Sequence, residues 1–254
     1  MIASLMMYRR PELDGEHDRF WALIRANLAA AGIGSPATLS QDLPEFDVWR
    51  DPELVLSQTC GMPYRLWLHD EVSLVGTPDY GLDGCPPGHY RSPFVVRRDD
   101  RRSALVDFRP ARFAYNQTHS QSGYAAPYNH LLDHGWWFDD RLHTEQHLES
   151  ARSVAEGRAD IATLDAVSWR LMQHHEPFAA NLRVLEWTEP TPGLPLITAR
   201  GNDADAIFTA TENAIAQLSD HDRDALGLVG LVRIPAEDYL AIPNPPGLAG
   251  SPVP

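Results

Sequence analysis

The stretch Asn116-Gln117-Thr118-His119-Ser120-Gln121-Ser122-Gly123-Tyr124 carries more information about the fold than any other part of this chain. A strand-like run ends just before it at Tyr115, and a helix-like run through Leu131 follows it. A helix start has backbone N–H groups without partners inside the helix and the positive end of the dipole, so it suits an anion. Serine hydroxyls add donors there. An ordinary helix N-cap fits the same residues.

Strands and helices alternate on both sides of this turn. Periodicity predicts strands over 54–56, 72–75, 93–96, 112–115, 161–164, 182–185 and 196–198, with an apolar first strand in 1–8. It predicts helices over 20–28, after 120, and over 145–156, 166–173 and 203–218, whereas 242–254 is rich in Pro and Gly and is expected to be irregular. This alternation predicts an α/β fold.

The chain crosses twice between two blocks, near 90–96 and again near 193–199. The crossings predict a discontinuous first lobe, residues 1–96 plus 194–254, and an inserted second lobe, residues 97–193. A lobe interrupted by another lobe is expected to leave a cleft between them, which is a common place for a ligand.

The composition of the chain argues against several classes of function. The 254 residues include 35 acidic and 21 basic side chains, giving a net charge of −14. Such a charge argues against nucleic acid or an anionic membrane surface as partner. No apolar run approaches the roughly 18 residues of a membrane span, so no membrane insertion is expected. No Walker loop or dinucleotide fingerprint is present, and no cofactor is expected.

The sequence leaves open both the cellular compartment of the protein and the oxidation state of its two cysteines. Residues 1–8 have no basic residue ahead of a short apolar run, unlike a signal peptide. The chain as written is therefore expected in the cytoplasm, or in the periplasm if a leader has been removed. Cys60 and Cys85 fit either a disulfide or two thiols, and a pair close in space is favoured.

Several motifs together resemble one family, the phosphate/phosphite/phosphonate-binding proteins of ABC importers. The motifs are Leu-Ser-Gln-Thr-Cys-Gly-Met-Pro-Tyr at 56–64, Gly-Thr-Pro-Asp-Tyr at 76–80 with Tyr-Arg-Ser-Pro-Phe-Val-Val-Arg at 90–97, the 116–123 turn, and His147 to Asp165. The resemblance spans about 50–200. It implies a two-lobe periplasmic-binding-protein type II fold that closes on a small oxyanion, and an importer permease as a possible partner.

The resemblance also implies a set of ligand-binding residues. In the second lobe, Ser120 and Ser122 would donate hydroxyls to the anion, and Asn116 would orient the turn. Asp165 would accept a hydrogen bond from a protonated ligand oxygen. The opposite lobe would contribute Tyr8 and the 57–61 turn. The complete expected set is Tyr8, Thr59, Asn116, Ser120, Gln121, Ser122, Gly123, His147 and Asp165.

Two alternatives to an anion-binding importer component are a cytoplasmic sensor and a serine hydrolase. A cytoplasmic relative of the same fold could sense another small ligand, such as an aromatic or pyrimidine compound. A serine hydrolase would need Ser122 as nucleophile with His147 and Asp165, but the Gly-x-Ser-x-Gly elbow is missing. Catalysis is therefore not expected.

Histidine and tryptophan side chains raise two further possibilities. The four-residue spacing of His143 and His147 on an expected helix start suits two zinc ligands, but no third ligand is evident, so no metal site is expected. Trp136, Trp137 and Trp169 either line the ligand site or belong to the core, and the core is favoured because of their large apolar area.

Overall fold

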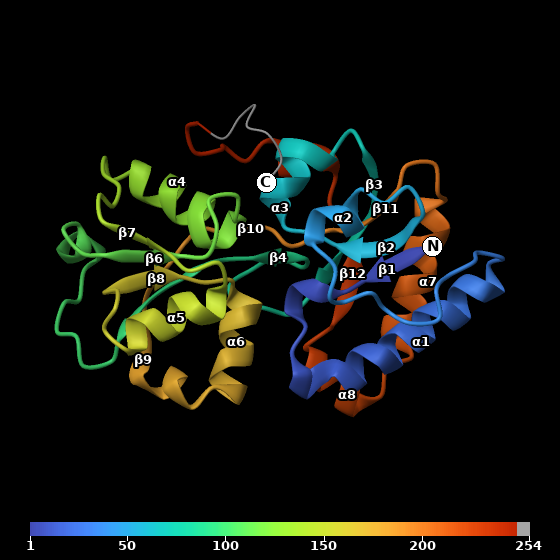
Figure 1. Cartoon of the computed structure of the whole chain (residues 1–254), viewed down its shortest axis with the longest axis horizontal. Helices are drawn as coiled ribbons and strands as arrows, with labels where there is room; N and C mark the ends of the chain where they lie inside the picture. The colour runs from blue at the N-terminus through green and yellow to red at the C-terminus, as the bar shows by residue number, and fades with distance from the viewer. Residues whose placement is uncertain (248–254) are drawn as a thin grey trace. The chain divides into compact units, whose positions relative to one another are not determined.

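The computed structural model describes residues 1–247, which form two compact units (Figure 1). The first unit comprises residues 1–89 and 192–241, and the second comprises 90–191 and 242–247. The chain passes from one unit to the other through two short strands that pair with each other, β4 (His89–Tyr90) and β10 (Thr191–Pro192). Each unit has its own mixed sheet, as expected for an α/β fold.

The bounds of the two units differ from the predicted lobes, 1–96 with 194–254 and 97–193. Strand β5 (Pro93–Arg97) pairs with β8 (Ile161–Thr163) and β9 (Leu182–Trp187), so it belongs to the second unit. Residues 242–247 also lie with the second unit, where the Asn129 amide donates to the Pro243 carbonyl at 2.9 Å. The rest of the predicted irregular end, 248–254, lies outside the described residues.

The first unit is built on a five-stranded sheet in the order β1-β2-β11-β3-β12. The strands are β1 (Ile2–Ser4), β2 (Leu54–Gln58), β11 (Leu196–Ala199), β3 (Val72–Asp79) and β12 (Gly230–Val232). Strand β1 runs parallel to β2, while β11 is antiparallel to β2 and β3. Adjacent residues of a strand face opposite sides, and accordingly Leu196 and Ile197 belong to two separate cores.

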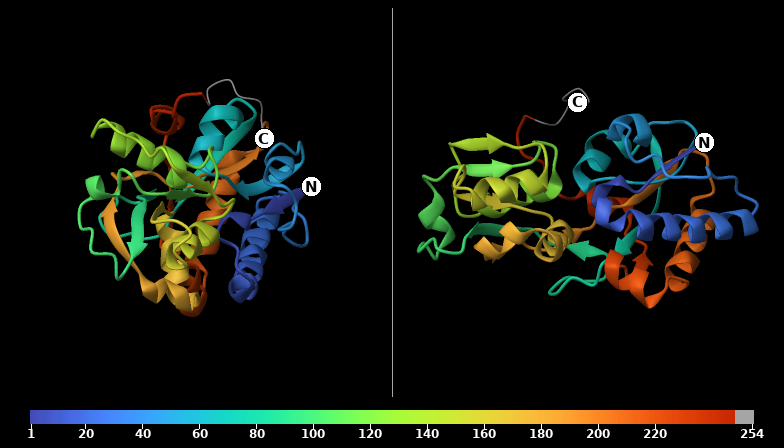
Figure 2. Two further views of the ribbon diagram at one scale, coloured as in Figure 1. Left: turned by 60° about the vertical axis from the view of Figure 1, so that its left-hand side comes forward. Right: turned by 60° about the horizontal axis from the view of Figure 1, so that its bottom comes forward.

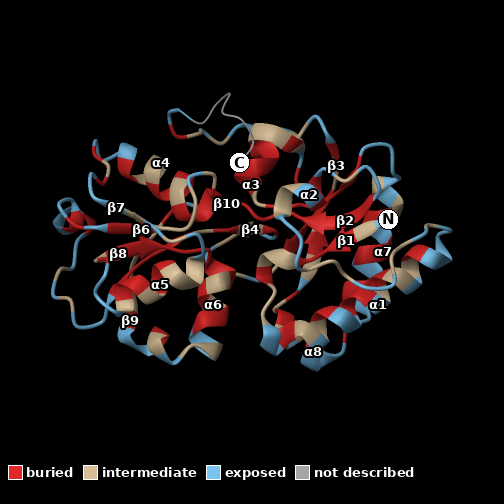
Figure 3. Cartoon of the chain, viewed as in Figure 1, coloured by how far each residue is buried: buried red, intermediate tan, exposed pale blue. Residues whose placement is uncertain are grey.

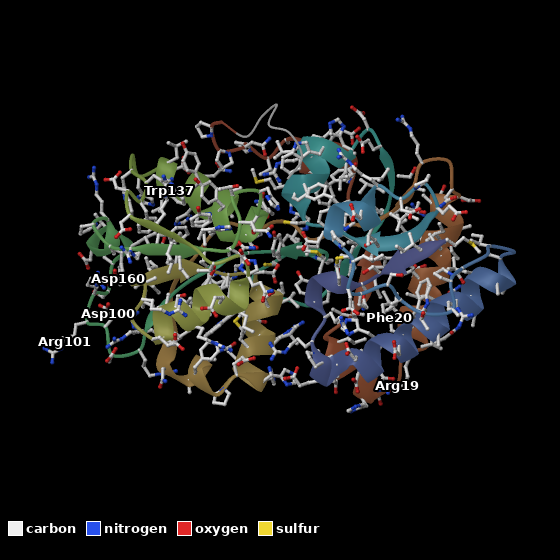
Figure 4. All side chains as sticks on the ribbon, in the orientation of Figure 1. Arg19, Phe20, Asp100, Arg101, Trp137 and Asp160 are labelled. Carbon is white, nitrogen blue, oxygen red and sulfur yellow. The ribbon has the colours of Figure 1, made fainter. Side chains whose placement is uncertain are left out.

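Helices cover both faces of this first sheet. One core gathers side chains of α1 (Asp14–Ala30), α7 (Ala204–Ala216) and α8 (Asp220–Leu226). The other gathers those of α2 (Glu45–Trp49), the π-helical turn η3 (Tyr64–Leu68), which follows the α3 segment (Gly61–Pro63), and α9 (Ala236–Leu240). Phe20 on α1 is buried in the first core, while its neighbour Arg19 bonds Asp222 on α8 at 2.6 Å (Figure 4). The remaining short helices are η1 (Met6–Tyr8) and η2 (Pro11–Leu13).

The second unit has a five-stranded sheet in the order β7-β6-β8-β5-β9. Its other strands are β7 (Arg141–His143) and β6 (Phe113–Tyr115), and both β7 and β8 run parallel to β6. One face packs on α5 (His147–Ala155), α6 (Ala166–His175) and η6 (Pro177–Asn181). The other packs on η4 (Leu105–Phe108) and on α4 (Ala126–Leu132), which continues the π-helical turn η5 (Gln121–Ala125). Figure 2 shows these strands and helices from two further sides.

Apolar side chains on both faces of the second sheet stabilise it. Phe94 and Val96 face one core while Val95 faces the other, and Phe113 and Ala114 divide in the same way. Figure 3 shows the sheet strands as mostly buried and the outer helix surfaces as exposed. Each sheet is therefore a middle layer with apolar side chains on both faces.

Most predicted elements are confirmed, and two local predictions are wrong. The first strand ends at Ser4, because the Gln41 side chain accepts from the Leu5 N–H at 2.9 Å where a strand partner would bond; Tyr8 lies in η1. His143 lies in strand β7 rather than on a helix start. Of the two alternatives left open for Cys60 and Cys85, the structure has two thiols with no disulfide between them. Within residues 1–247, no helix has the length and apolar character needed to cross a membrane.

Candidate functional site

Three parallel strands of the second unit have their carboxyl ends on the same side of its sheet. Strand β6 leads to the helical turn η5, β7 leads to α5, and β8 leads to α6. The carboxyl ends of parallel strands point the same way, so all three helices begin on this side. In open α/β sheets ligands bind outside the carboxyl ends of the strands. The predicted residues of the second lobe lie in the segments that follow these strand ends.

Ser120 is the N-cap of the turn between β6 and α4. Its hydroxyl oxygen accepts from the Gly123 N–H at 3.0 Å, and its carbonyl accepts from the Ala125 N–H at 3.0 Å. The second bond spans five residues and makes the first turn π-helical, a form often found at functional sites. The N-cap interpretation is therefore confirmed. A hydroxyl that accepts at the cap still has its own proton to donate to a ligand.

Gly123 is required by the close approach of Asn116. A Cβ atom at position 123 would lie 2.0 Å from Asn116 Oδ1 and 3.1 Å from His147 Cε1. The Asn116 oxygen is buried and has no hydrogen-bond partner among residues 1–247. On the other side, the Thr163 hydroxyl donates to the Gly123 carbonyl at 3.2 Å and fixes the turn to β8. Close packing therefore holds the turn in one conformation.

His147, the first residue of α5, contacts the turn directly. Its Nε2 lies 3.0 Å from Ser122 Oγ. Its Nδ1 is buried, and burial lowers the pKa of His147 to about 4, although the backbone of Thr163 partly opposes this shift. The imidazole is thus neutral at pH 7 and can share one hydrogen bond with the Ser122 hydroxyl.

Asp165 forms the N-cap of α6. Its Oδ1 accepts from the Ser168 N–H at 2.9 Å, and the residue is 2 % exposed. The carboxylate therefore has a structural task in addition to any contact with a ligand. Its predicted bond to a protonated ligand oxygen stays a prediction.

The turn has little exposed surface. Ser120, Gln121 and Ser122 are 5 %, 1 % and 2 % exposed. Asn116 and His147 are partly exposed. A ligand that bonds the Ser122 hydroxyl must therefore displace the groups that cover it.

Tyr8 and Thr59 belong to the first unit, where β1 and β2 run parallel and end at one edge of the sheet. The Tyr8 ring stands edge-on to Tyr80 at 5.1 Å. Thr59 is fully buried and its N–H donates to the Pro195 carbonyl at 3.0 Å. Cys60 follows as the N-cap of the α3 segment. A strand followed directly by a helix start thus occurs in this unit as well.

Two threonines and a strained residue were missed by the sequence analysis. The Thr144 hydroxyl lies 2.6 Å from Ser150 Oγ and donates to the Tyr115 carbonyl at 3.0 Å, which ties β7, α5 and β6 together. Thr163 anchors Gly123. Glu145, between β7 and α5, has φ of 66°, the only positive φ of a non-glycine residue in the described part of the chain. Such strain is common near functional sites.

Two of the three tryptophans considered as ligand contacts, Trp136 and Trp169, belong to the cores of the second unit. Trp136 and Trp169 are 9 % and 4 % exposed and belong to its two cores. The Trp137 ring, labelled in Figure 4, packs edge-on against Phe113, Tyr124 and Tyr128. The core interpretation is confirmed for Trp136 and Trp169.

Solved structures of three proteins share this fold. PhnD1 from Prochlorococcus marinus, in complex with methylphosphonate, has a TM-score of 0.70 at 14% identity, covering 94% of each chain. XAC2383 from Xanthomonas citri, bound to ATP, has a TM-score of 0.67 at 17% identity, covering 94% of this chain and 93% of that one. A binding protein component of an ABC phosphonate transporter from Pseudomonas aeruginosa has a TM-score of 0.66 at 15% identity, with 94% and 82% covered.

A search of curated proteins found no match to this chain. A family model does match, over residues 67–239, and it describes the phosphonate periplasmic substrate-binding proteins of ABC transporters. The matched region contains the 116–123 turn, His147 and Asp165, whereas Tyr8 and Thr59 lie before it. The chain therefore belongs to the phosphonate periplasmic substrate-binding protein family of ABC transporters, and its role is that of a substrate-binding protein.

Proposed function

We propose that the chain binds a small oxyanion of the phosphonate or phosphate class at the 116–123 turn and serves an ABC importer. The observation that carries this proposal is the Ser122–His147 contact of 3.0 Å. It lies where three helical segments begin, at the carboxyl ends of β6, β7 and β8. Helix starts supply N–H donors and a positive partial charge, and serine hydroxyls supply further donors. These groups together suit a tetrahedral anion.

Binding free energy comes mainly from hydrogen bonds to the charged ligand. A bond of this kind contributes roughly 1.5–3 kcal/mol net, provided that its donor is already in place. Thr163 and Gly123 hold the turn in place before the ligand arrives. The net charge of −14 does not prevent binding, because donors at short range act more strongly than distant, screened charges.

A second part of the proposal is that the chain does not catalyse a reaction. A Ser122 nucleophile would need His147 as its base, and a base with a pKa of about 4 accepts a proton poorly at neutral pH. Asp165, the candidate orienting carboxylate, caps α6 through Oδ1. The pair therefore fits a role in hydrogen bonding to a ligand better than a role in proton transfer.

Ligand entry must expose a buried turn. Ser120, Gln121 and Ser122 have almost no exposed surface, so a closed complex would shield the anion from water. The predicted closing movement and the predicted contributions of Tyr8 and Thr59 stay predictions.

A panel of ligands tests the proposed function. Thermal unfolding is followed with phosphate, phosphite, methylphosphonate, sulfate and uracil at equal ionic strength. A ligand at 100 times its dissociation constant should stabilise the folded state by about 2.7 kcal/mol. Stabilisation by phosphonate or phosphate, with no effect of uracil, supports the proposal. Stabilisation by uracil alone would replace it with the binding of another class of ligand.

A further inference from the structure

Two histidines and a glutamate come together in the second unit, outside the 116–123 turn. His130 Nε2 lies 2.7 Å from Glu186 Oε1, and the His130 and His134 rings are 5.7 Å apart. One ligand atom from each of the three residues lies within 4.8 Å of the others. We propose that His130, His134 and Glu186 bind a divalent transition-metal ion, with zinc as the ion of choice.

The local fold explains why these three side chains meet. His130 lies on α4, and His134 follows one turn later, where its N–H donates to the Leu131 carbonyl at 3.0 Å. Residues four apart on a helical segment share a face. Glu186 lies on β9 opposite Phe94 of β5, and the Phe94 ring is 5.6 Å from the His130 ring. The cluster thus joins a helix to the edge strand of the sheet beneath it.

The ligand chemistry suits zinc. Two imidazoles and one carboxylate are a recurrent zinc set, with water in the fourth position. Tetrahedral zinc with bonds of about 2.0–2.2 Å places its ligand atoms roughly 3.3–3.6 Å apart, so the side chains must rotate to close on the ion. His130 and Glu186 side chains are 16% and 41% exposed, and His134 is exposed. An ion can therefore reach the site, and water can complete its coordination.

The chain contains a second group of the same residue types, which serves as an internal control. Glu16, His221 and Asp222 also lie within 4.8 Å of one another. There, however, the Arg19 guanidinium already bonds Glu16 at 2.7 Å and Asp222 at 2.6 Å. That cation bonds both carboxylates and offsets part of their negative charge. Among the ion pairs described for residues 1–247, His130 is the partner of Glu186, and no arginine pairs with this glutamate.

Zinc binding should stabilise the second unit. The ion would bridge α4 and β9, which both pack on the core that contains Phe94 and Leu131. Because ligating imidazoles must be unprotonated, zinc affinity should fall on acidification. None of the candidate anion-binding residues is a ligand of this site, so the inference stands independently of the proposed function.

The test uses the full chain without a histidine tag, freed of metal with a chelator and titrated with ZnCl₂ in a calorimeter. We expect one zinc per chain. His134→Ala, which removes an exposed side chain, should weaken binding at least tenfold, whereas the matched variant His221→Ala should bind as the unsubstituted chain does. Cobalt(II) should give the visible absorption bands of a four-coordinate ion, and His134→Ala should abolish them.

Three results would overturn the inference. They are no saturable zinc binding at millimolar metal, equal affinity of His134→Ala and the unsubstituted chain, and loss of binding in His221→Ala instead. Ser122→Ala should retain zinc binding, so a failed anion assay would leave this test unaffected.

Discussion

Ser122 Oγ and His147 Nε2 lie 3.0 Å apart and join the turn after β6 to the first residue of α5. Burial of the imidazole lowers the pKa of His147 to about 4. The contact therefore couples the protonation of one side chain to the geometry of the candidate anion turn.

His147 should make the stability of the protein depend on pH. Its folded-state pKa is lowered, so between about pH 4 and the ordinary value near 6.5 the unfolded state binds a proton that the native state does not. Stability should therefore be lost as pH falls from 6.5 towards 4, by up to about 3 kcal/mol from this residue.

Urea unfolding at pH 7.0, 6.0, 5.0 and 4.5 measures this effect, in His147→Gln beside the unsubstituted chain. The variant has no titrating imidazole and should show a smaller loss of stability on acidification. His174→Gln changes an exposed histidine and should keep the original slope. An identical pH dependence in all three proteins would contradict the assigned pKa shift.

Gly123→Ala should destabilise the second unit by about 1–3 kcal/mol, as overpacking typically does. The added Cβ would lie 2.0 Å from Asn116 Oδ1, so either the turn or the amide must move. Denaturant unfolding gives the change in free energy. Gly230→Ala is the matched control, because a Cβ there meets no atom within 4 Å. Equal stability of Gly123→Ala and Gly230→Ala would refute the described packing.

Asp165 has two candidate roles that substitutions can separate. Asp165→Ala removes the cap of α6 and should cost about 1 kcal/mol, whereas Asp165→Asn keeps a good capping residue and should cost little. If the carboxylate also accepts a hydrogen bond from a protonated ligand oxygen, Asp165→Asn should weaken phosphonate binding while leaving stability unchanged. Full affinity in the Asn variant would limit Asp165 to capping.

The sequence predicted the elements that carry a clear periodicity. Strands around Leu54, Val72 and Val95 and the helix from Asp203 were confirmed, because alternation or helical spacing marks residues that face a core. Strand β7 was missed since it has only three residues, two of them exposed, and only its pairing with β6 defines it. Helix α8 was missed because its sequence, Asp-His-Asp-Arg-Asp-Ala-Leu, is almost entirely polar.

In the candidate site, too, some features can be recognised in the sequence and others depend on the fold. Ser120 and Asp165 precede helices in the sequence, and their capping roles can be recognised there. The contact between Ser122 and His147 spans 25 residues and depends on the order of β6 and β7 in the sheet. Thr163 was missed for the same reason, since its partner, the Gly123 carbonyl, lies 40 residues away. Only the sheet order brings such residues together.

The central claim is that the Ser122 hydroxyl bonds a small oxyanion, and calorimetric titration with methylphosphonate tests it most directly. The unsubstituted chain, Ser122→Ala and Ser103→Ala are compared at pH 7, because Ser103 is an exposed serine of the same unit. Loss of one charge-assisted hydrogen bond, roughly 1.5–3 kcal/mol, should weaken binding by Ser122→Ala about 10- to 150-fold. Ser103→Ala should bind as the unsubstituted chain does. Equal affinity of all three proteins for methylphosphonate would contradict the account.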